Sequence, residues 1–273
     1  MSPSSKVAVK IGGDLIKGEE LNKPLLEDLC SLAKQGGLVV VHGGGDIVTE
    51  FAKRLGKEQV FVVSPEGFKS RYTDRETAEI YAMVMAGMIN TKIVGVFQQF
   101  GINAVGLSGF DGGLLRAERK KRLVIVDEQG RKRAIEGGYT GKISSVNSAL
   151  IETLLSGGYV PVISPLAMGL EFEPLNVDGD RTTASVAKSI QADAVVYLTD
   201  VEGVMDGGKV IRKIAALEVE GLLEKIGPGM STKIHAAVEA VKGGVKRAII
   251  TSGFAEKPIS SALEGNKGTV ISL

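Results

Sequence analysis

The chain has 273 residues, and 44% of them are hydrophobic, which is enough to bury the core of one large domain or two modest ones. The 33 lysines and arginines nearly balance the 32 aspartates and glutamates, so the overall charge does not indicate a nucleic-acid-binding protein. A single cysteine and two distant histidines exclude a disulfide framework and a zinc-type site. The sequence shows no signal peptide and no run near ~18 apolar residues, so we expect a cytoplasmic protein that does not span a membrane.

Apolar strands and amphipathic helices alternate from the start of the chain. Residues 7–11 are an apolar run that ends at Gly12-Gly13, which predicts a buried strand and a tight turn. Further helices are predicted over residues 25–34, 47–55, 73–86, 91–101, 147–155, 181–190 and 231–241, and further strands over residues 38–41, 104–107, 160–163, 194–198, 247–251 and 268–271. Residues 123–126 and 132–135 flank a polar turn and predict a hairpin.

This alternation predicts an α/β fold, a three-layer αβα sandwich with a mostly parallel central sheet. Loop residues between 165 and 176 suggest a division into two halves, residues 1–175 and residues 176–273.

Two glycine-rich turns follow predicted strands in the first half, Lys10-Ile11-Gly12-Gly13 and His42-Gly43-Gly44-Gly45. In an open α/β sheet ligands bind outside the carboxyl ends of the strands, and glycines there let backbone N–H groups approach an anion. The turns favour a phosphate site, although each alone is as often an ordinary turn. Neither turn is a P-loop, and neither has the regular glycine spacing of a dinucleotide fingerprint.

The second half contains a compact polar segment, residues 175–180, before a predicted helix. Asp180 is placed to cap that helix, or it could orient lysines around a phosphoryl group through charge-assisted hydrogen bonds. Thr199-Asp200 follows a later strand and could contact a nucleotide or merely end the strand. Lys233, by its spacing alone, could be an ordinary solvated lysine.

Taken in order, these motifs resemble the amino acid kinase family over essentially the whole chain. The motifs are Lys-x-Gly-Gly, His-Gly-Gly-Gly, Asn-x-Asp-Gly-Asp, Thr-Asp-Val-x-Gly-Val and Gly-Met-x-x-Lys. Within the family the chain is similar to acetylglutamate kinases, and more narrowly to kinases that act on 2-aminoadipate or glutamate attached to a small acidic amino-group carrier protein. Residues 70–77, 138–141 and 237–247 carry the narrower resemblance.

The resemblance implies a role for each matching residue, with ATP and Mg²⁺ as cofactors. The implied magnesium is held through the ATP phosphates, with no protein metal site. The implied catalytic residues are Lys10, Lys233 and Asp180; the substrate-binding residues are Gly43, Gly44, Gly45, Arg71 and Asn176; the nucleotide-binding residues are Gly12, Gly13, Thr199, Asp200 and Met230.

The chain departs from the acetylglutamate kinases at Asp178-Gly179, where those enzymes usually carry Asn-Ala. This difference favours a substrate other than free acetylglutamate. The resemblance also implies a homodimer. Because the sequence begins almost at its first predicted strand, we expect the protein to lack the extra N-terminal helix of related arginine-inhibited hexamers and to show no arginine feedback.

A local basic strip runs from Arg116 to Arg133, with eight cations and three acids. It contains no interleaved aromatic residues, which argues against single-stranded nucleic acid, and it fits an acidic protein partner. The alternative is a solvated hairpin whose charged edges discourage aggregation. If the strip docks the carrier, the residues involved are Arg119, Lys120, Lys121, Arg122, Arg131, Lys132 and Arg133.

Three other functions were weighed. A kinase for free N-acetyl-L-glutamate shares the chemistry and differs in substrate. A nucleotide-binding sensor without turnover is disfavoured by the full set of Lys10, Asp180 and Lys233. A dinucleotide-dependent oxidoreductase fails because the glycine fingerprint is absent.

Overall fold

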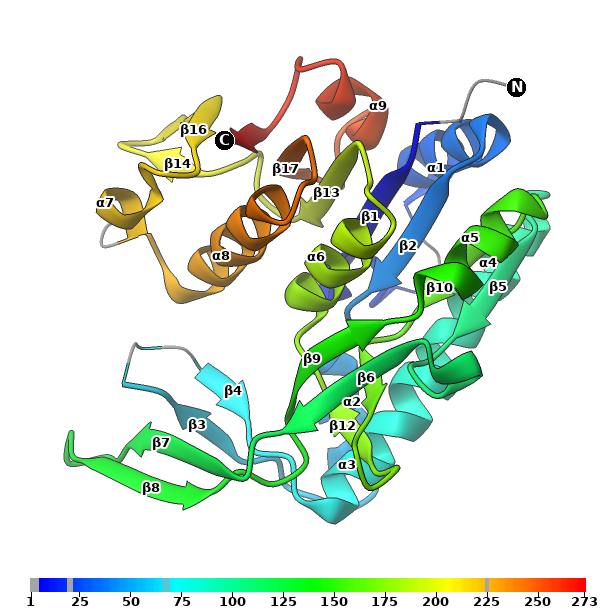
Figure 1. The fold of residues 1–273 in the computed structure, drawn as a ribbon. Helices are drawn as coiled ribbons and strands as arrows, with labels where there is room; N and C mark the ends of the chain where they lie inside the picture. Colours follow the sequence, from blue (N-terminus) through cyan, green and yellow to red (C-terminus); the bar gives the residue numbers. More distant parts are fainter. Residues whose placement is uncertain (1–4, 19–21, 66, 68, 224–225) are drawn as a thin grey trace.

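The computed structural model describes residues 5–18, 22–65, 67, 69–223 and 226–273. Its centre is an eight-stranded sheet in which only the β17–β18 pair is antiparallel (Figure 1). In spatial order the strands are β16 (Lys213–Ala215), β18 (Thr269–Ser272), β17 (Arg247–Ser252), β13 (Ala194–Thr199), β1 (Val7–Ile11), β2 (Leu38–His42), β10 (Val160–Ile163) and β5 (Ala104–Leu107).

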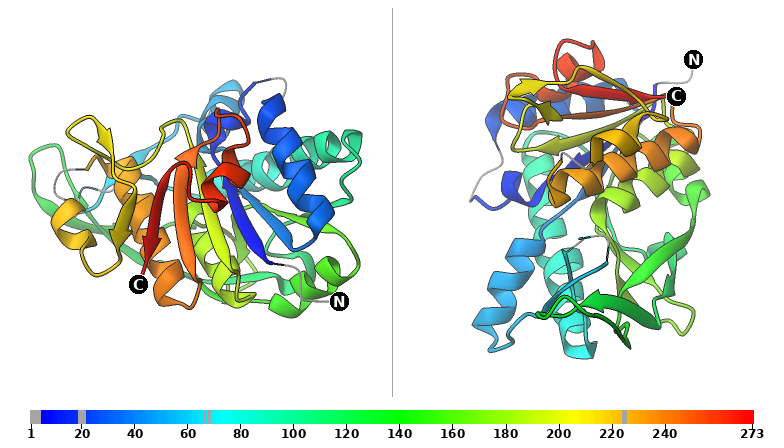
Figure 2. Two further views of the ribbon diagram at one scale, coloured as in Figure 1. Left: turned by 90° about the horizontal axis from the view of Figure 1, so that it is seen from above. Right: turned by 90° about the vertical axis from the view of Figure 1, so that its left-hand side faces the viewer.

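Helices cover both faces of this sheet, which confirms the predicted three-layer sandwich (Figure 2). One face carries α5 (Ser148–Ser156), α6 (Gly179–Ser189), α7 (Val219–Leu223) and α8 (Pro228–Lys242). The other carries α1 (Lys23–Gln35), α2 (Gly45–Arg54), α9 (Pro258–Leu263) and a long helix described below. Because both faces are covered, the central strands are hydrophobic throughout rather than alternating.

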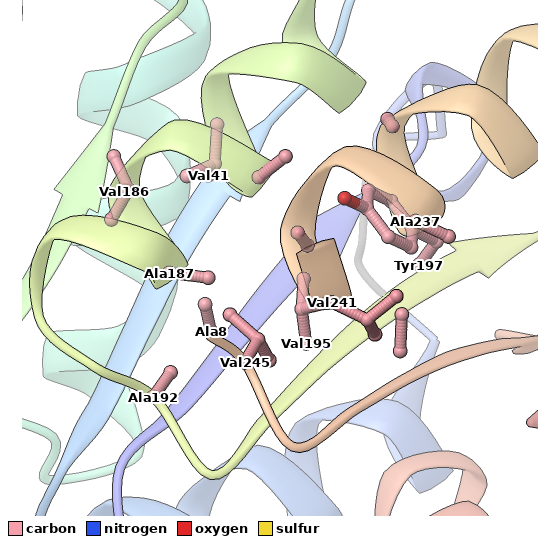
Figure 3. Packing of buried hydrophobic residues seen from close by; sticks show 14 of the residues in the cluster. Ala8, Val41, Val186, Ala187, Ala192, Val195, Tyr197, Ala237, Val241 and Val245 are labelled. Carbon is pink, nitrogen blue, oxygen red and sulfur yellow. The ribbon is translucent and has the colours of Figure 1, made fainter. Parts of the chain in front are cut away.

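Lys10 points to the face of the sheet that α6 and α8 cover. Successive side chains of a strand point to opposite faces, so Ala8 packs under α6 and α8, while Val9 packs in the core on the other face. Figure 3 shows Ala8 among Val186, Val195 and other small side chains of this core. Lys10 lies two residues beyond Ala8 and therefore shares the α6 face of the sheet.

The predicted helices over residues 73–86 and 91–101 are one continuous helix, so their separation was wrong. The helix consists of α3 (Arg75–Ala82), the π-helical segment η2 (Met83–Ile89) and α4 (Asn90–Gln99). Asp74 caps its start by accepting a hydrogen bond from Thr77 N. A glycine such as Gly87 weakens a helix without ending it, and here the chain continues from α3 to α4 as a π-helical segment.

By length and composition, this helix is the one candidate membrane span among the described residues, although its apolar residues do not form an uninterrupted run of that length. Within this helix, 44% of the most apolar 18-residue segment is buried inside the protein, and Val84, Met85 and Phe97 belong to the core. That pattern is typical of a core helix with one open face.

A second, four-stranded sheet was not predicted, because its strands are short and partly polar. Its order is β12 (Pro174–Asn176), β11 (Leu166–Met168), β6 (Leu115–Arg119) and β9 (Gly141–Val146). The predicted hairpin is confirmed as β7 (Arg122–Val126) and β8 (Lys132–Glu136), which projects beside a smaller hairpin of β3 (Phe61–Val63) and β4 (Lys69–Arg71) (Figure 1). A third hairpin pairs β14 (Met205–Asp206) with β15 (Lys209–Val210), and single 3-10 turns are η1 (Gly13–Leu15) and η3 (Asp111–Gly113).

Candidate active site

The two predicted glycine turns meet at the carboxyl ends of β1 and β2. Gly43 N donates to Ile11 O at 2.8 Å, and a Cβ on Gly43 would lie only 3.2 Å from Gly13 N. A side chain at either turn would therefore separate the two backbones. This close approach explains why glycines follow both strands. It also brings the backbone N–H groups of the two turns close together.

Beside these turns, Asp180 holds two lysines from different elements. Lys10 Nζ, at the end of β1, lies 3.1 Å from Asp180 Oδ1, and Lys233 Nζ, on α8, lies 3.1 Å from Asp180 Oδ2. All three side chains are less than a fifth exposed. The cluster carries a net positive charge, so it is suited to bind an anion.

Of the two alternative roles predicted for Asp180, helix capping was wrong, because Asp178 caps α6 by accepting a hydrogen bond from Arg181 N at 2.8 Å. Asp180 instead lies in the first helical turn and points toward the lysines. Enclosure by protein would raise the pKa of Asp180, but the charges of Lys10 and Lys233 outweigh it and hold that pKa below its ordinary value. Asp178 lines the cavity with an exposed side chain, and desolvation by the surrounding protein, with the nearby charge of Asp180, raises its pKa.

Arg71 and Asn176 also line the site. The Arg71 guanidinium donates to Gly45 O at 2.7 Å and to Thr49 Oγ1 at 2.9 Å, which connects it to the second glycine turn. Asn176 donates to Thr73 Oγ1 at 3.0 Å. Burial lowers the pKa of Arg71, but a guanidinium stays charged at any physiological pH.

These residues surround a cavity of about 840 Å³. Among its walls are the predicted residues Lys10, Gly13, Gly43, Gly44, Gly45, Arg71, Asn176 and Asp180. Five other predicted residues are not in its walls. Thr199 ends β13 and bonds to Asp200 at 2.9 Å, Gly12 packs against Leu198 O, Met230 lies in the first turn of α8, and Lys233 reaches the site through Asp180.

Sequence reasoning missed a buried pair beneath the second glycine turn. Asn90 Nδ2 lies 2.9 Å from Val162 O and 3.3 Å from His42 Nε2, so Nε2 is an acceptor and the His42 proton sits on Nδ1. That Nδ1 lies 2.9 Å from Gly43 O and donates to it. A histidine ending an otherwise apolar strand, and an asparagine within an apolar helix, were the available signals. The pair fixes the carbonyl at the start of the turn.

His42 should make the protein less stable in mild acid. Burial, assisted by the charge of Lys10, lowers its pKa to about 4. The unfolded chain binds a proton near pH 6.5 while the folded one does not, so the free energy of unfolding should fall by about 2 kcal/mol between pH 7 and pH 5. Urea unfolding of the wild type and of His42→Gln at both pH values measures this. The variant should lose that slope, and equal slopes would contradict the assignment.

The predicted docking cations are engaged to different degrees. Arg131 and Arg133 both pair with Asp127, at 3.0 and 2.9 Å, at the tip of the β7–β8 hairpin. Arg119 donates to Gly138 O at 2.5 Å and stacks on the Tyr139 ring. Among the described residues, Lys120, Lys121, Arg122 and Lys132 have no carboxylate partner.

No group of three or more His, Cys, Asp or Glu side chains in the described part of the chain could ligate a metal ion. The donors at the site are lysines and backbone amides, which suit phosphate oxygens rather than a bare cation. Such donors are suited to the phosphate groups of a magnesium-bound nucleotide.

The comparisons with known proteins agree with this geometry. The model of the amino acid kinase family matches residues 5–252. A LysW-aminoadipate/LysW-glutamate kinase of Saccharolobus islandicus is 48% identical over 266 residues, covering 97% of this chain and 98% of the relative. A Cenarchaeum symbiosum protein provisionally given the same name is 54% identical over 265 residues, covering 97% and 98%.

Solved structures show the same fold. N-acetylglutamate synthase from Neisseria gonorrhoeae superposes with a TM-score of 0.81 at 26% identity, over 99% of this chain and 60% of that one. Carbamate kinase from Giardia lamblia superposes with a TM-score of 0.67 at 17% identity, over 100% and 99%. The family match and the nearly full-length relatives lead to one conclusion: the chain belongs to the amino acid kinase family.

Proposed function

We propose that this protein uses ATP to phosphorylate the side-chain carboxylate of 2-aminoadipate or glutamate attached to an acidic amino-group carrier protein. The product is an acyl phosphate, used in lysine biosynthesis, and in arginine biosynthesis where glutamate is the substrate. The observation that carries the proposal is Asp180 holding Lys10 and Lys233 beside two glycine turns at the wall of the cavity. The names of the relatives at about 50% identity support the substrate class.

The chemistry needs positioning and positive charge rather than a general base. A carboxylate is already ionised at neutral pH, so its oxygen can attack the γ-phosphorus directly while the bond to the β–γ bridging oxygen breaks and ADP leaves. We assign Lys10 and Lys233 to stabilise the charge on the transferring phosphoryl group, and Asp180 to hold both ammonium groups in place. Magnesium, when bound with ATP, supplies further positive charge at the phosphates.

The remaining roles divide between the amino acid and the nucleotide. We propose that Gly43, Gly44 and Gly45 donate backbone hydrogen bonds near the reacting carboxylate, and that Arg71 and Asn176 bind the other end of the amino acid. Nucleotide contacts are assigned to Gly12, Gly13, Thr199, Asp200 and Met230. In this scheme most contacts to the amino acid come from residues 1–175 and most contacts to the nucleotide from residues 176–273, with Gly12, Gly13 and Asn176 as the exceptions.

The cations of the β7–β8 hairpin region are proposed to attract the acidic carrier. Lys120, Lys121, Arg122 and Lys132 are the strongest candidates, because they have no carboxylate partner among the described residues. Local charge of this kind accelerates association and orients the partner.

We also propose a cytoplasmic homodimer. Support comes from the open face of the long helix, where Met83 is 55% exposed and Met88 41%. Exposed apolar side chains clustered on one helix face are common at interfaces between subunits. Light scattering in solution would measure the mass, and a monomer would contradict the proposal.

Trapping of the acyl phosphate with hydroxylamine tests the function. Glutamate and aminoadipate attached to the carrier's C-terminus should give hydroxamate in the presence of ATP and Mg²⁺, while free N-acetyl-L-glutamate should not. Turnover of free acetylglutamate alone would instead identify an acetylglutamate kinase. Nucleotide binding without turnover of any of these substrates would identify a sensor.

A further inference from the structure

A second group of cations lines the outer part of the cavity, away from the hairpin tip. Arg181, Ser185 and Lys188 recur at helical spacing along one side of α6, and all three are in the cavity wall. Lys142 of β9 and Lys242 at the end of α8 join the same wall. Figure 1 shows α6 beside α8, with β9 next to α6. We call Lys120, Lys142, Arg181, Lys188 and Lys242 the α6–α8 cationic face.

Most of this charge is not neutralised by the protein. Arg181 pairs with Glu239 at 3.4 Å, whereas the four lysines of the face have no carboxylate within 4 Å among the described residues. Burial lowers the pKa of Lys120, the charges of Arg181 and Lys142 lower it further, and the charge of Asp178 offsets part of that shift. Asp178 and Glu239 line the same wall, but the five cations outnumber them, and such an excess of positive charge is costly to the folded protein, which is expected where a ligand supplies the negative charge.

Helix dipoles do not account for the arrangement. Lys188 and Lys242 lie in the last turns of their helices, where a cation is favourable. Arg181, however, lies in the first turn of α6, the unfavourable end for a cation, and Lys142 lies on a strand. What the cations share is the cavity wall, not a position within their elements.

The packing of α6 on α8 orients Lys188. A Cβ on Gly243 would overlap Lys188 Cδ and would lie 2.7 Å from its Cγ, so the aliphatic stem of Lys188 lies across this glycine. The contact limits the rotamers open to Lys188 and keeps its ammonium group at the cavity. A preorganised cation binds a partner at a lower entropic cost than a free one.

We propose that the α6–α8 cationic face docks an acidic protein that presents its substrate on an extended chain end. The proposal rests on the proposed function and adds the docking surface and the form of the partner. Arg181 adjoins Asp180, and Lys188 lies seven residues further along α6, or about 10 Å from it. An extended chain spans that distance with about three residues, so the reacting amino acid must lie at least that far from the body of its carrier.

Charge reversal of the two outermost lysines tests the proposal. Lys188→Glu/Lys242→Glu should raise the KM for carrier-linked glutamate or aminoadipate at least tenfold, leave kcat at saturation within twofold, and weaken the dependence of KM on salt. The matched control is Lys34→Glu/Lys213→Glu, which makes the same charge change at exposed lysines on α1 and β16 without ion-pair partners in the described chain. This control should leave KM unchanged.

Further measurements separate the possible outcomes. Calorimetric titration with the carrier lacking its amino acid should show binding to the wild type that the double variant loses, and the thermal midpoint shows whether that variant is folded. Absence of wild-type turnover on the linked substrates would refute the proposed function. Wild-type turnover with an unchanged carrier KM in a folded variant would refute the docking surface alone. A raised KM for ATP instead would assign the face to nucleotide phosphates and overturn the proposal.

Discussion

Asp180→Asn should lower kcat by about 10²–10³-fold, the usual effect of losing one preorganised charge-stabilising element. The substitution keeps the shape of the side chain but removes the negative charge that brings two ammonium groups within 3.1 Å of one carboxylate. Lys10 and Lys233 would then repel each other and leave the positions at which both can face one phosphoryl group. Steady-state release of ADP at saturating substrates measures the loss.

A second measurement distinguishes positioning from a general structural effect. If Asp180 acts through the lysines, Lys10→Ala should lower kcat by about 10²-fold in the wild type and by much less in Asp180→Asn, because the effects of coupled residues do not add. Asp193→Asn is the control, since it removes an ion pair with Lys246 outside the cavity and should leave kcat unchanged. A near-normal kcat in Asp180→Asn would show that the cluster is not catalytic.

The central sheet was predictable because its strands are buried on both faces. Residues 104–107 and 160–163 were located to the residue, since a short apolar run bounded by polar residues has few alternatives. The small sheet was not found, because strands such as β12 have only three residues and owe their conformation to pairing with β11. Local patterns carry no information about such partners.

The candidate site was likewise predictable only in part. Lys10 and the two glycine turns are visible as motifs at the ends of strands, whereas the contact between Asp180 and Lys233 spans 53 positions and depends on the packing of α6 against α8. Periodicity could not establish which acidic residue caps α6, because Asp178 and Asp180 are both plausible caps. His42 and Asn90 were missed because their significance lies in being buried together.

Gly44→Ala should both destabilise the protein and impair catalysis. Gly44 has φ +142°, a conformation that side chains rarely adopt, and a Cβ there would overlap Ile89 Cδ1 and lie 3.3 Å from Met85 Sδ. Both neighbours are fully buried, so they cannot move without disturbing the core of the long helix. Backbone strain and overpacking together should lower the free energy of unfolding by about 2–4 kcal/mol.

The catalytic loss follows from the position of the turn. Gly44 lies between the carbonyl that accepts from His42 and the carbonyl that accepts from Arg71, so a shift at Gly44 displaces both anchors and the N–H groups between them. Gly56→Ala is the matched control, because Gly56 also has positive φ, at +80°, but has no atom within 4 Å of an added Cβ. It should cost about 1 kcal/mol and leave kcat/KM unchanged. Equal costs for the two variants in urea unfolding would show that contact with Ile89 does not constrain the turn. A stable Gly44→Ala enzyme with normal kcat/KM would show that the turn does not position the reacting groups.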